Sequence, residues 1–400
     1  MGRSSLYLVV GFNLIFGILG FNLSRVSNEG YTNYVTYYNE TQAHNIASSG
    51  TNVACNQLFQ DGTWRAGYTN VPFAGGAYSV RVTDVAGQRI RLNAIGTHEG
   101  ESAYISVLFG PSSFAKFAYY SVVEGGIYWG TGDTVWGPWH SETKLTVKGD
   151  PVFYGKTTTR IGLFKNPPTS DPKFYGGFES GVGVELPDDM DPLRNAAQSG
   201  GAYFHDTDVW LTFNSDATVS FRTTAGGSDS TVSLAAFAPN GTIVTYKGNL
   251  HVKGIVNGQV TIGALGSSGG GYGNVYLDDN IVYSVDPSSS SCTDLLGSCA
   301  ESNVVITENT ENNSDIRIQG ALFCLTGGFT AENYNSRPLS GTIFLTGGIQ
   351  QYQREPVGKY AGSVLTNGFG KNIRYDDRLA DLSPPYYPTT KNLEILSWYE

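Results

Sequence analysis

The sequence has little charge and no concentration of basic groups. Only 15% of its 400 residues are Asp, Glu, Lys or Arg, the formal net charge is −10, and no run of Lys and Arg is longer than two residues. Proteins that bind nucleic acid need a basic surface to neutralise phosphates. This balance therefore excludes nucleic acid as a partner.

Histidine is also scarce and is spread along the chain. The five histidines show neither the His-x-His nor the His-Glu-x-x-His spacing of a zinc site, and they are His44, His98, His140, His205 and His251. The glycine-rich stretch at 266–271 lacks the Lys-Ser/Thr pair of a phosphate-binding loop. We therefore expect no metal site, no cofactor and no enzyme activity.

An enzymatic alternative depends on two pairs of neighbouring carboxylates, Asp278-Asp279 and Asp376-Asp377. In a carbohydrate-acting enzyme on a β-helix scaffold, paired carboxylates would cleave a glycosidic bond. Adjacent residues on a strand point to opposite faces, so neither pair is automatically a pair in space. A turn at 278–280 and a surface ion pair of Asp376 with Arg374 or Arg378 are the simpler interpretations.

Four cysteines are too few and too dispersed for a zinc site with two close pairs. Cys292 and Cys299 bracket a loop short enough for a local disulfide, and two buried thiols are the equally acceptable alternative. We expect Cys55 and Cys324 to be core residues.

The chain begins with an apolar run at 6–23 that is interrupted only by glycines, Asn13 and Asn22. Its length is close to the ~20 residues that a membrane-spanning helix needs. No Ala-x-Ala cleavage site follows the run, so we expect residues 1–24 to remain as an anchor. Asn13 would either bond a neighbouring helix or be a tolerated polar residue. The anchor residues that we single out are Leu6, Phe12, Asn13, Phe16 and Leu23.

The helix is predicted to continue beyond the apolar run. Small and apolar residues recur every three or four positions and form one stripe: Ala43, Ile46, Ala47, Gly50, Val53, Ala54 and Leu58. We expect a bend near Gly30 and an end at Asp61-Gly62. Alternating strands at 78–82, 89–95 and 103–109 then predict an antiparallel meander.

This start, from the short basic terminus to the meander, resembles the PilX-type minor pilin-like proteins of bacteria over the first 112 residues. The resemblance implies cleavage by a prepilin peptidase after Gly2, which would leave Arg3 as the first residue. It also implies that the helix meets other pilin-like subunits. Tyr7 stands where major pilins carry a glutamate.

The rest of the chain, 113–400, is rich in glycine and aromatic residues, which predicts short strands with many corners. Its Trp129-Gly-Thr-Gly, Trp136-Gly-Pro-Trp139 and C-terminal Trp398-Tyr-Glu segments are similar to those of DUF4900-type bacterial surface proteins. Alternating runs recur roughly every 20–30 residues, which is typical of a β-solenoid. We expect a right-handed β-helix-like ectodomain with a C-terminal cap, and we keep a β-sandwich as the alternative.

One group of aromatic residues is a candidate ligand platform. Trp129, Trp136 and Trp139, with Tyr128, would stack against a sugar or peptide, or would close a β core, which is the commoner role of such a cluster.

The sequence thus predicts a mainly β, membrane-anchored, pilin-like surface protein with a structural or adhesive role. Its expected partners are the membrane, other pilin-like subunits and a surface glycan or protein. Its expected location is the bacterial envelope, anchored in the inner membrane or in a surface filament, with the ectodomain exported. The alternatives are the carbohydrate-acting enzyme and a pseudopilin-like part of a secretion system.

Overall fold

The computed structural model describes residues 2–85, 89–267, 271–361 and 364–400. The chain forms two compact units: Met1–Pro111 together with Asn392–Glu400, and Ser112–Lys391. The second unit begins at Ser112, one residue before the start of the predicted ectodomain at 113. The last nine residues, which the predicted 113–400 ectodomain includes, belong to the first unit, whereas Leu379 and Tyr387 of the predicted cap pack in the second.

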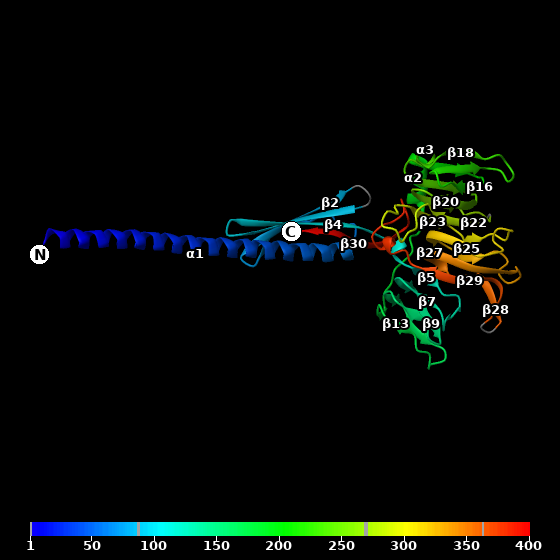
Figure 1. Ribbon diagram of the computed structural model, residues 1–400, viewed down its shortest axis with the longest axis horizontal. Helices are drawn as coiled ribbons and strands as arrows, with labels where there is room; N and C mark the ends of the chain where they lie inside the picture. Colours follow the sequence, from blue (N-terminus) through cyan, green and yellow to red (C-terminus); the bar gives the residue numbers. More distant parts are fainter. Residues whose placement is uncertain (1, 86–88, 268–270, 362–363) are drawn as a thin grey trace. The chain divides into compact units, whose positions relative to one another are not determined.

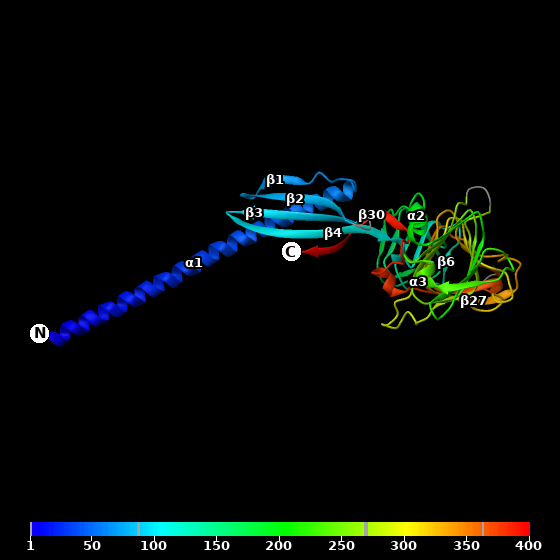
Figure 2. The same ribbon diagram turned by 90° about the horizontal axis from the view of Figure 1, so that it is seen from above.

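Helix α1 (Arg3–Gln60) is one continuous helix, about 87 Å long at 1.5 Å per residue. The predicted bend at Gly30 is absent, because α1 is one uninterrupted helix, and Figure 2 shows it without a sharp kink. The helix ends at Asp61, where Asp61 N–H donates to the Gln57 carbonyl and the Asp61 carboxylate accepts from the Thr63 N–H.

The second half of α1 packs on an antiparallel sheet. The sheet order is β1 (Tyr68–Phe73), β2 (Gly76–Val85), β3 (Arg89–His98), β4 (Glu101–Ser113) and β30 (Thr389–Tyr399). The predicted meander is confirmed by the antiparallel registers of β2 with β3 and of β3 with β4. Strands β1 and β30 were not predicted.

The predicted stripe is the buried face of α1, with one exception. Ile46, Ala47, Ala54 and Leu58 pack with strand residues in one core, whereas Val53 is 46% exposed. The helix lies so close to β3 at Gly96 that an added Cβ there would stand 2.3 Å from the Ala43 carbonyl oxygen. The small residues of the stripe therefore set the distance between helix and sheet.

The second unit is built mainly from parallel ladders. The longest ladder, in spatial order, is β15 (Ala202–His205), β19 (Thr242–Tyr246), β21 (Gln259–Leu265), β23 (Leu295–Ala300), β25 (Ile316–Cys324), β27 (Leu339–Gln353), β5 (Tyr119–Val123), β8 (Trp139–Ser141), β11 (Thr157–Thr159) and β14 (Phe178–Ser180). Figure 1 shows this order as a green-to-orange part of the chain followed by a teal part.

Shorter parallel ladders form the other walls. The first consists of β16 (Val209–Phe213), β20 (Leu250–Val256), β22 (Val275–Tyr283), β24 (Val304–Ile306) and β26 (Phe329–Ala331). The second consists of β7 (Thr134–Val135), β10 (Val152–Phe153) and β13 (Lys173–Phe174). The third consists of β6 (Trp129–Gly130), β9 (Lys144–Lys148) and β12 (Gly162–Lys165). Strand β29 (Val364–Arg374) pairs in parallel with β27. Residues in register stack into buried apolar columns, such as Leu250, Val275, Val304 and Phe329.

Antiparallel hairpins and short helices complete the second unit, so its sheets are mixed. Hairpins join β16 to β17 (Thr218–Arg222) and β18 (Ser230–Ser233), and β28 (Gly358–Ala361) to β29. The helices are η1 (Phe114–Lys116), α2 (Asp191–Gly200), α3 (Leu234–Phe237) and η2 (Asp377–Ala380). A second core on the outside of the long ladder includes Phe114, Leu193, Phe323, Leu379 and Tyr387. The right-handed solenoid expected from the sequence remains a prediction.

We predict that Gly96→Ala weakens the first unit. The new Cβ would meet the α1 backbone, which no side-chain rotation relieves, and overpacking of this kind costs about 1–3 kcal/mol. Hydrogen exchange of the β2 and β3 amides should report the loss. Gly30→Ala is the control, because nothing lies within 4 Å of that position; equal protection in the two variants would contradict close packing at Gly96.

Candidate functional site

The first half of α1 is apolar and exposed. By length and composition this helix is able to cross a membrane, and no residue of its most apolar window is buried. Leu6, Phe16 and Leu23 are 66%, 67% and 74% exposed, and Phe12 is also exposed. The Asn13 Nδ2 donates to the Val9 carbonyl at 2.9 Å, so its own helix satisfies this amide.

The start of α1 is defined by Gly2. Gly2 is the exposed N-cap residue with extended backbone angles, and the helix begins at Arg3. The peptide bond between the two residues thus joins an extended residue to the first helical one. This is where the sequence predicts processing.

The predicted aromatic platform is not formed as expected, because two of its three tryptophans point inward. Trp129 and Trp139 are buried in the core, with their rings edge to face at 6.1 Å. The Trp129 Nε1 donates to the buried Glu124 at 3.0 Å, and the Arg354 guanidinium lies 4.2 Å from the centroid of the Trp129 ring system. The alternative role as part of a β core describes both residues.

Trp136 instead belongs to a different, exposed group, which we call the aromatic column: Trp136, Tyr154 and Tyr175. Their rings stack at centroid distances of 4.4 Å and 5.2 Å, with interplanar angles of 8° and 19°. The side chains are 50%, 43% and 69% exposed. The three residues directly follow β7, β10 and β13, which are in parallel register.

Glycines allow the backbones of the three successive turns of the column to approach closely. Each ring is followed by a glycine, and these are Gly137, Gly155 and Gly176. An added Cβ would stand 2.1 Å from the Gly137 carbonyl carbon at Gly155, and 2.3 Å from the Gly155 carbonyl carbon at Gly176. The repeated pattern of an apolar residue, Trp or Tyr, and Gly at 135–137, 153–155 and 174–176 is the sequence signal that could have located the column.

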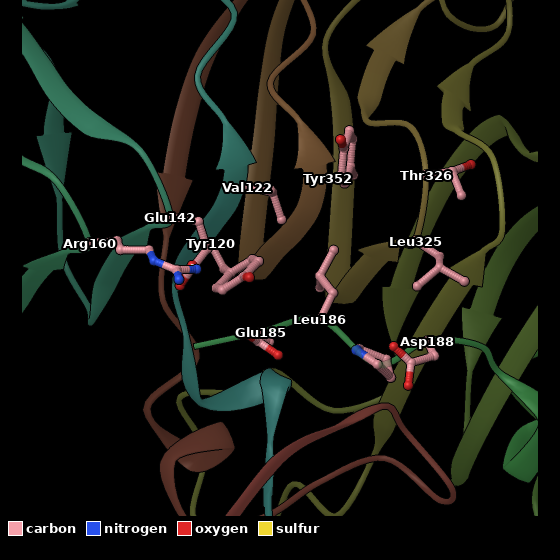
Figure 3. A pocket seen from close by; sticks show the side chains of 11 residues that line it. Tyr120, Val122, Glu142, Arg160, Glu185, Leu186, Asp188, Leu325, Thr326 and Tyr352 are labelled. Carbon is pink, nitrogen blue, oxygen red and sulfur yellow. The ribbon is translucent and has the colours of Figure 1, made fainter. Parts of the chain in front are cut away.

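A cavity of about 330 Å³ lies on the outer side of the long ladder (Figure 3). Its lining residues are Tyr120, Val122, Glu142, Arg160, Glu185, Leu186, Pro187, Asp188, Leu325, Thr326 and Tyr352. The segment with Leu186 is tied down where the Tyr120 hydroxyl donates to the Val184 carbonyl at 2.6 Å and the Val184 N–H donates to Glu142. Two residues after Leu186, Asp188 forms an ion pair with Lys391 at 2.9 Å.

A polar network of His140, Glu142, Thr158 and Arg160 adjoins this cavity, which Glu142 and Arg160 line. His140 Nε2 is 2.9 Å from Glu142 Oε1, His140 Nδ1 is 2.7 Å from Thr158 Oγ1, and Arg160 Nη1 is 2.9 Å from Glu142 Oε2. A neutral imidazole that donates to Glu142 and accepts from Thr158 gives both ring nitrogens of His140 a hydrogen-bond partner. His140 and Thr158 do not line the cavity, whereas Glu142 and Arg160 do, and the contact of His140 with Thr158 joins β8 to β11.

Burial and hydrogen bonding shift the ionisation of this network. Burial lowers the pKa of His140, and the hydrogen bond to Glu142 offsets this only in part. Burial alone would raise the pKa of Glu142, but hydrogen bonds from Val184, His140 and Arg160 outweigh it and hold the pKa below its usual value. A neutral histidine and an ionised glutamate are therefore the folded-state forms near neutral pH.

The two carboxylate pairs of the enzymatic alternative are engaged elsewhere. Asp376 caps η2 and forms an ion pair with Arg378 at 2.7 Å, one of the two arginine partners considered from the sequence. Asp278 Oδ1 contacts His251 and accepts from Thr307, while Asp279 accepts from Asn280. Within residues 2–85, 89–267, 271–361 and 364–400 there is no group of three or more metal-ligating side chains.

Of the two alternatives for Cys292 and Cys299, the structure has the buried thiols and not the local disulfide, and all four cysteines are free and buried. Cys292 packs in the inner core and Cys299 in the outer one, which separates the two thiols. Burial raises the pKa of Cys55 to about 11 and that of Cys324 to about 12, so neither is a reactive thiolate.

The first unit combines a long helix, whose first half is apolar and exposed, with an antiparallel sheet that packs on the second half. One similar solved structure is the crystal structure of the competence-associated pilin ComZ from Thermus thermophilus. It is 14% identical to this chain over 90% of this chain and 97% of that one, with a TM-score of 0.37. No protein-family model and no curated protein matches the chain. The resemblance to DUF4900-type proteins therefore stays a prediction.

We predict that acid weakens the second unit through His140. Because the folded state holds the pKa of His140 below its usual value near 6.5, the unfolded chain takes up the proton first as the pH falls. Stability should fall below about pH 6.5, by at most about 1.4 kcal/mol per pH unit for one proton. Glu142 should add to the loss below about pH 4.5, where the unfolded carboxylate begins to protonate.

Urea unfolding followed by tryptophan fluorescence at pH 7.5 and pH 5.5 measures this effect. His140→Gln should reduce the difference between the two pH values, whereas His205→Gln, at an exposed site, should leave it unchanged. An unchanged difference in His140→Gln would show that another group causes the dependence.

Proposed function

We propose that this chain is a membrane-anchored, pilin-like surface protein, a minor pilin or filament-associated module with a structural or adhesive role. The observation that supports it best is the division of α1 into an exposed apolar half and a half packed on the sheet. Exposed apolar surface of this length is costly in water and is stabilised in a bilayer or among other helices. The apolar half would supply the anchor and the contacts to other pilin-like subunits.

We further propose that Ser112–Lys391 is a right-handed β-solenoid exported beyond the membrane. The parallel ladders support this, because β19, β21, β23 and β25 pair successively while the intervening strands form a second ladder. In a solenoid each turn contacts only its neighbours and presents a regular outer surface. Such a surface suits presentation to a ligand.

Membrane anchoring is tested with charged substitutions in the apolar half. We expect Phe12→Lys with Phe16→Lys to release the chain from membranes, because each central lysine costs about 2.5–3.5 kcal/mol of insertion. The readout is the fraction that sediments with membranes after carbonate extraction. Tyr31→Lys with Tyr34→Lys adds the same charge outside the apolar run and should stay bound. Release of both variants, or of neither, would contradict the proposed anchor.

Processing is tested by mass spectrometry of the N-terminal peptide in membranes and in sheared surface filaments. We expect a peptide that begins at Arg3 and enrichment in the filaments, since Gly2 is exposed directly before the helix start. Gly2→Ile should retain Met1 and be absent from filaments. Wild-type filaments that retain Met1 would refute processing, and absence of the chain from filaments would refute filament entry.

A further inference from the structure

The aromatic column has one open ring face, on Tyr175. Trp136 lies between Tyr154 and the Arg374 guanidinium, which is 6.0 Å from its ring centroid, and Tyr154 lies between its two neighbours. In the part of the chain that the structure describes, Tyr154 is the only ring within stacking distance of Tyr175. Tyr175 is also the most exposed of the three residues.

The column holds this open ring in place before any ligand binds. Tyr175 stacks on Tyr154 at 5.2 Å, and its neighbour Phe174 is fixed by parallel pairing with Phe153 and by ring stacking at 5.2 Å. Ordering a free side chain on binding would cost about 0.5–1.5 kcal/mol. The stack therefore makes Tyr175 a preformed flat surface.

An ion pair with no net charge stands next to Tyr175 in the chain. Lys173 is two residues earlier, so on the extended strand it shares the outer face of Tyr175, and it pairs with Asp171. This pair is largely exposed and offers hydrogen-bond donors as well as acceptors. The cation that follows Tyr154 in the sequence, Lys156, also has a carboxylate partner, Glu179 at 2.8 Å.

These features favour a neutral saccharide over other ligands. A pyranose ring presents a face of C–H groups to an aromatic ring and hydroxyl groups to polar side chains at its edge. Each cation already has a carboxylate partner, which disfavours an anion. Three half-exposed rings, each of about 150–250 Å² when whole, offer far less than the ~800 Å² that a stable protein interface buries on each partner.

We propose that the open face of Tyr175 is a binding site for a neutral saccharide, with Lys173–Asp171 as its hydrogen-bonding edge. A saccharide would be the ligand in the adhesive role proposed above, and the biological setting of this site rests on that proposed function. The stack of Trp136 and Tyr154 acts as the support that keeps Tyr175 in position.

The test is depletion of the purified full-length chain by insoluble cellulose, chitin, starch and mannan, in a detergent without a sugar headgroup. We expect retention on at least one of these and at least a tenfold loss of binding in Tyr175→Ala. Tyr175→Phe should bind because it keeps the ring. Tyr272→Ala, an exposed tyrosine outside the column, should bind like the wild type.

The proposal is overturned if the wild-type chain binds none of the four polysaccharides, or if Tyr175→Ala binds as well as the wild type. Thermal unfolding of each variant checks that the fold is kept, and Lys173→Ala provides a second variant at the edge, expected to weaken binding several-fold. The assay is independent of membrane attachment. A chain that binds sugar but does not sediment with membranes would refute the proposed anchor and leave the saccharide site intact.

Discussion

The second unit depends on the pairing of β27 with β5. The first strand of this unit along the chain is β5, yet it lies in the interior of the long ladder, between β27 and β8. Its backbone groups are satisfied on both sides only when residues 349–353 have arrived. Buried backbone polar groups are costly without partners. Neither set of turns can therefore leave this edge of β5 unpaired without a loss of stability. The junction therefore joins residues 119–180 to residues 202–353 in one stack.

Charge and ring packing specify this junction. Arg354, just after β27, forms an ion pair with Glu124, just after β5, at 3.1 Å, and both side chains are almost fully buried. Trp129 satisfies the same carboxylate and lies under the same guanidinium. Burying a charge pair adds little net stability, but leaving one partner unpaired is strongly unfavourable. The pair thus favours this register of β27 and β5 over a shifted one.

Sequence patterns predicted the elements whose information is local. The period of Ala43, Ile46, Ala47 and Leu58 identified the buried face of α1, and alternation identified the meander. The entry of β5 into the middle of the ladder has no local signal, because it depends on residues more than two hundred positions away. The return of β30 to the first unit is non-local in the same way.

The inward and outward directions of the tryptophans illustrate a second limit of prediction from sequence patterns. Strands β6, β7 and β8 have only two or three residues each, so alternation cannot be followed through the glycine corners between them. Trp129 and Trp139 fall on inward positions and Trp136 on an outward one, although all three lie within eleven residues. What separates them is the corner geometry, and a following glycine does not reveal it by itself, because the inward Trp129 also precedes a glycine. Repetition of an aromatic residue followed by glycine on three successive turns, rather than the number of aromatic residues, is therefore the pattern that distinguishes an exposed column from a core.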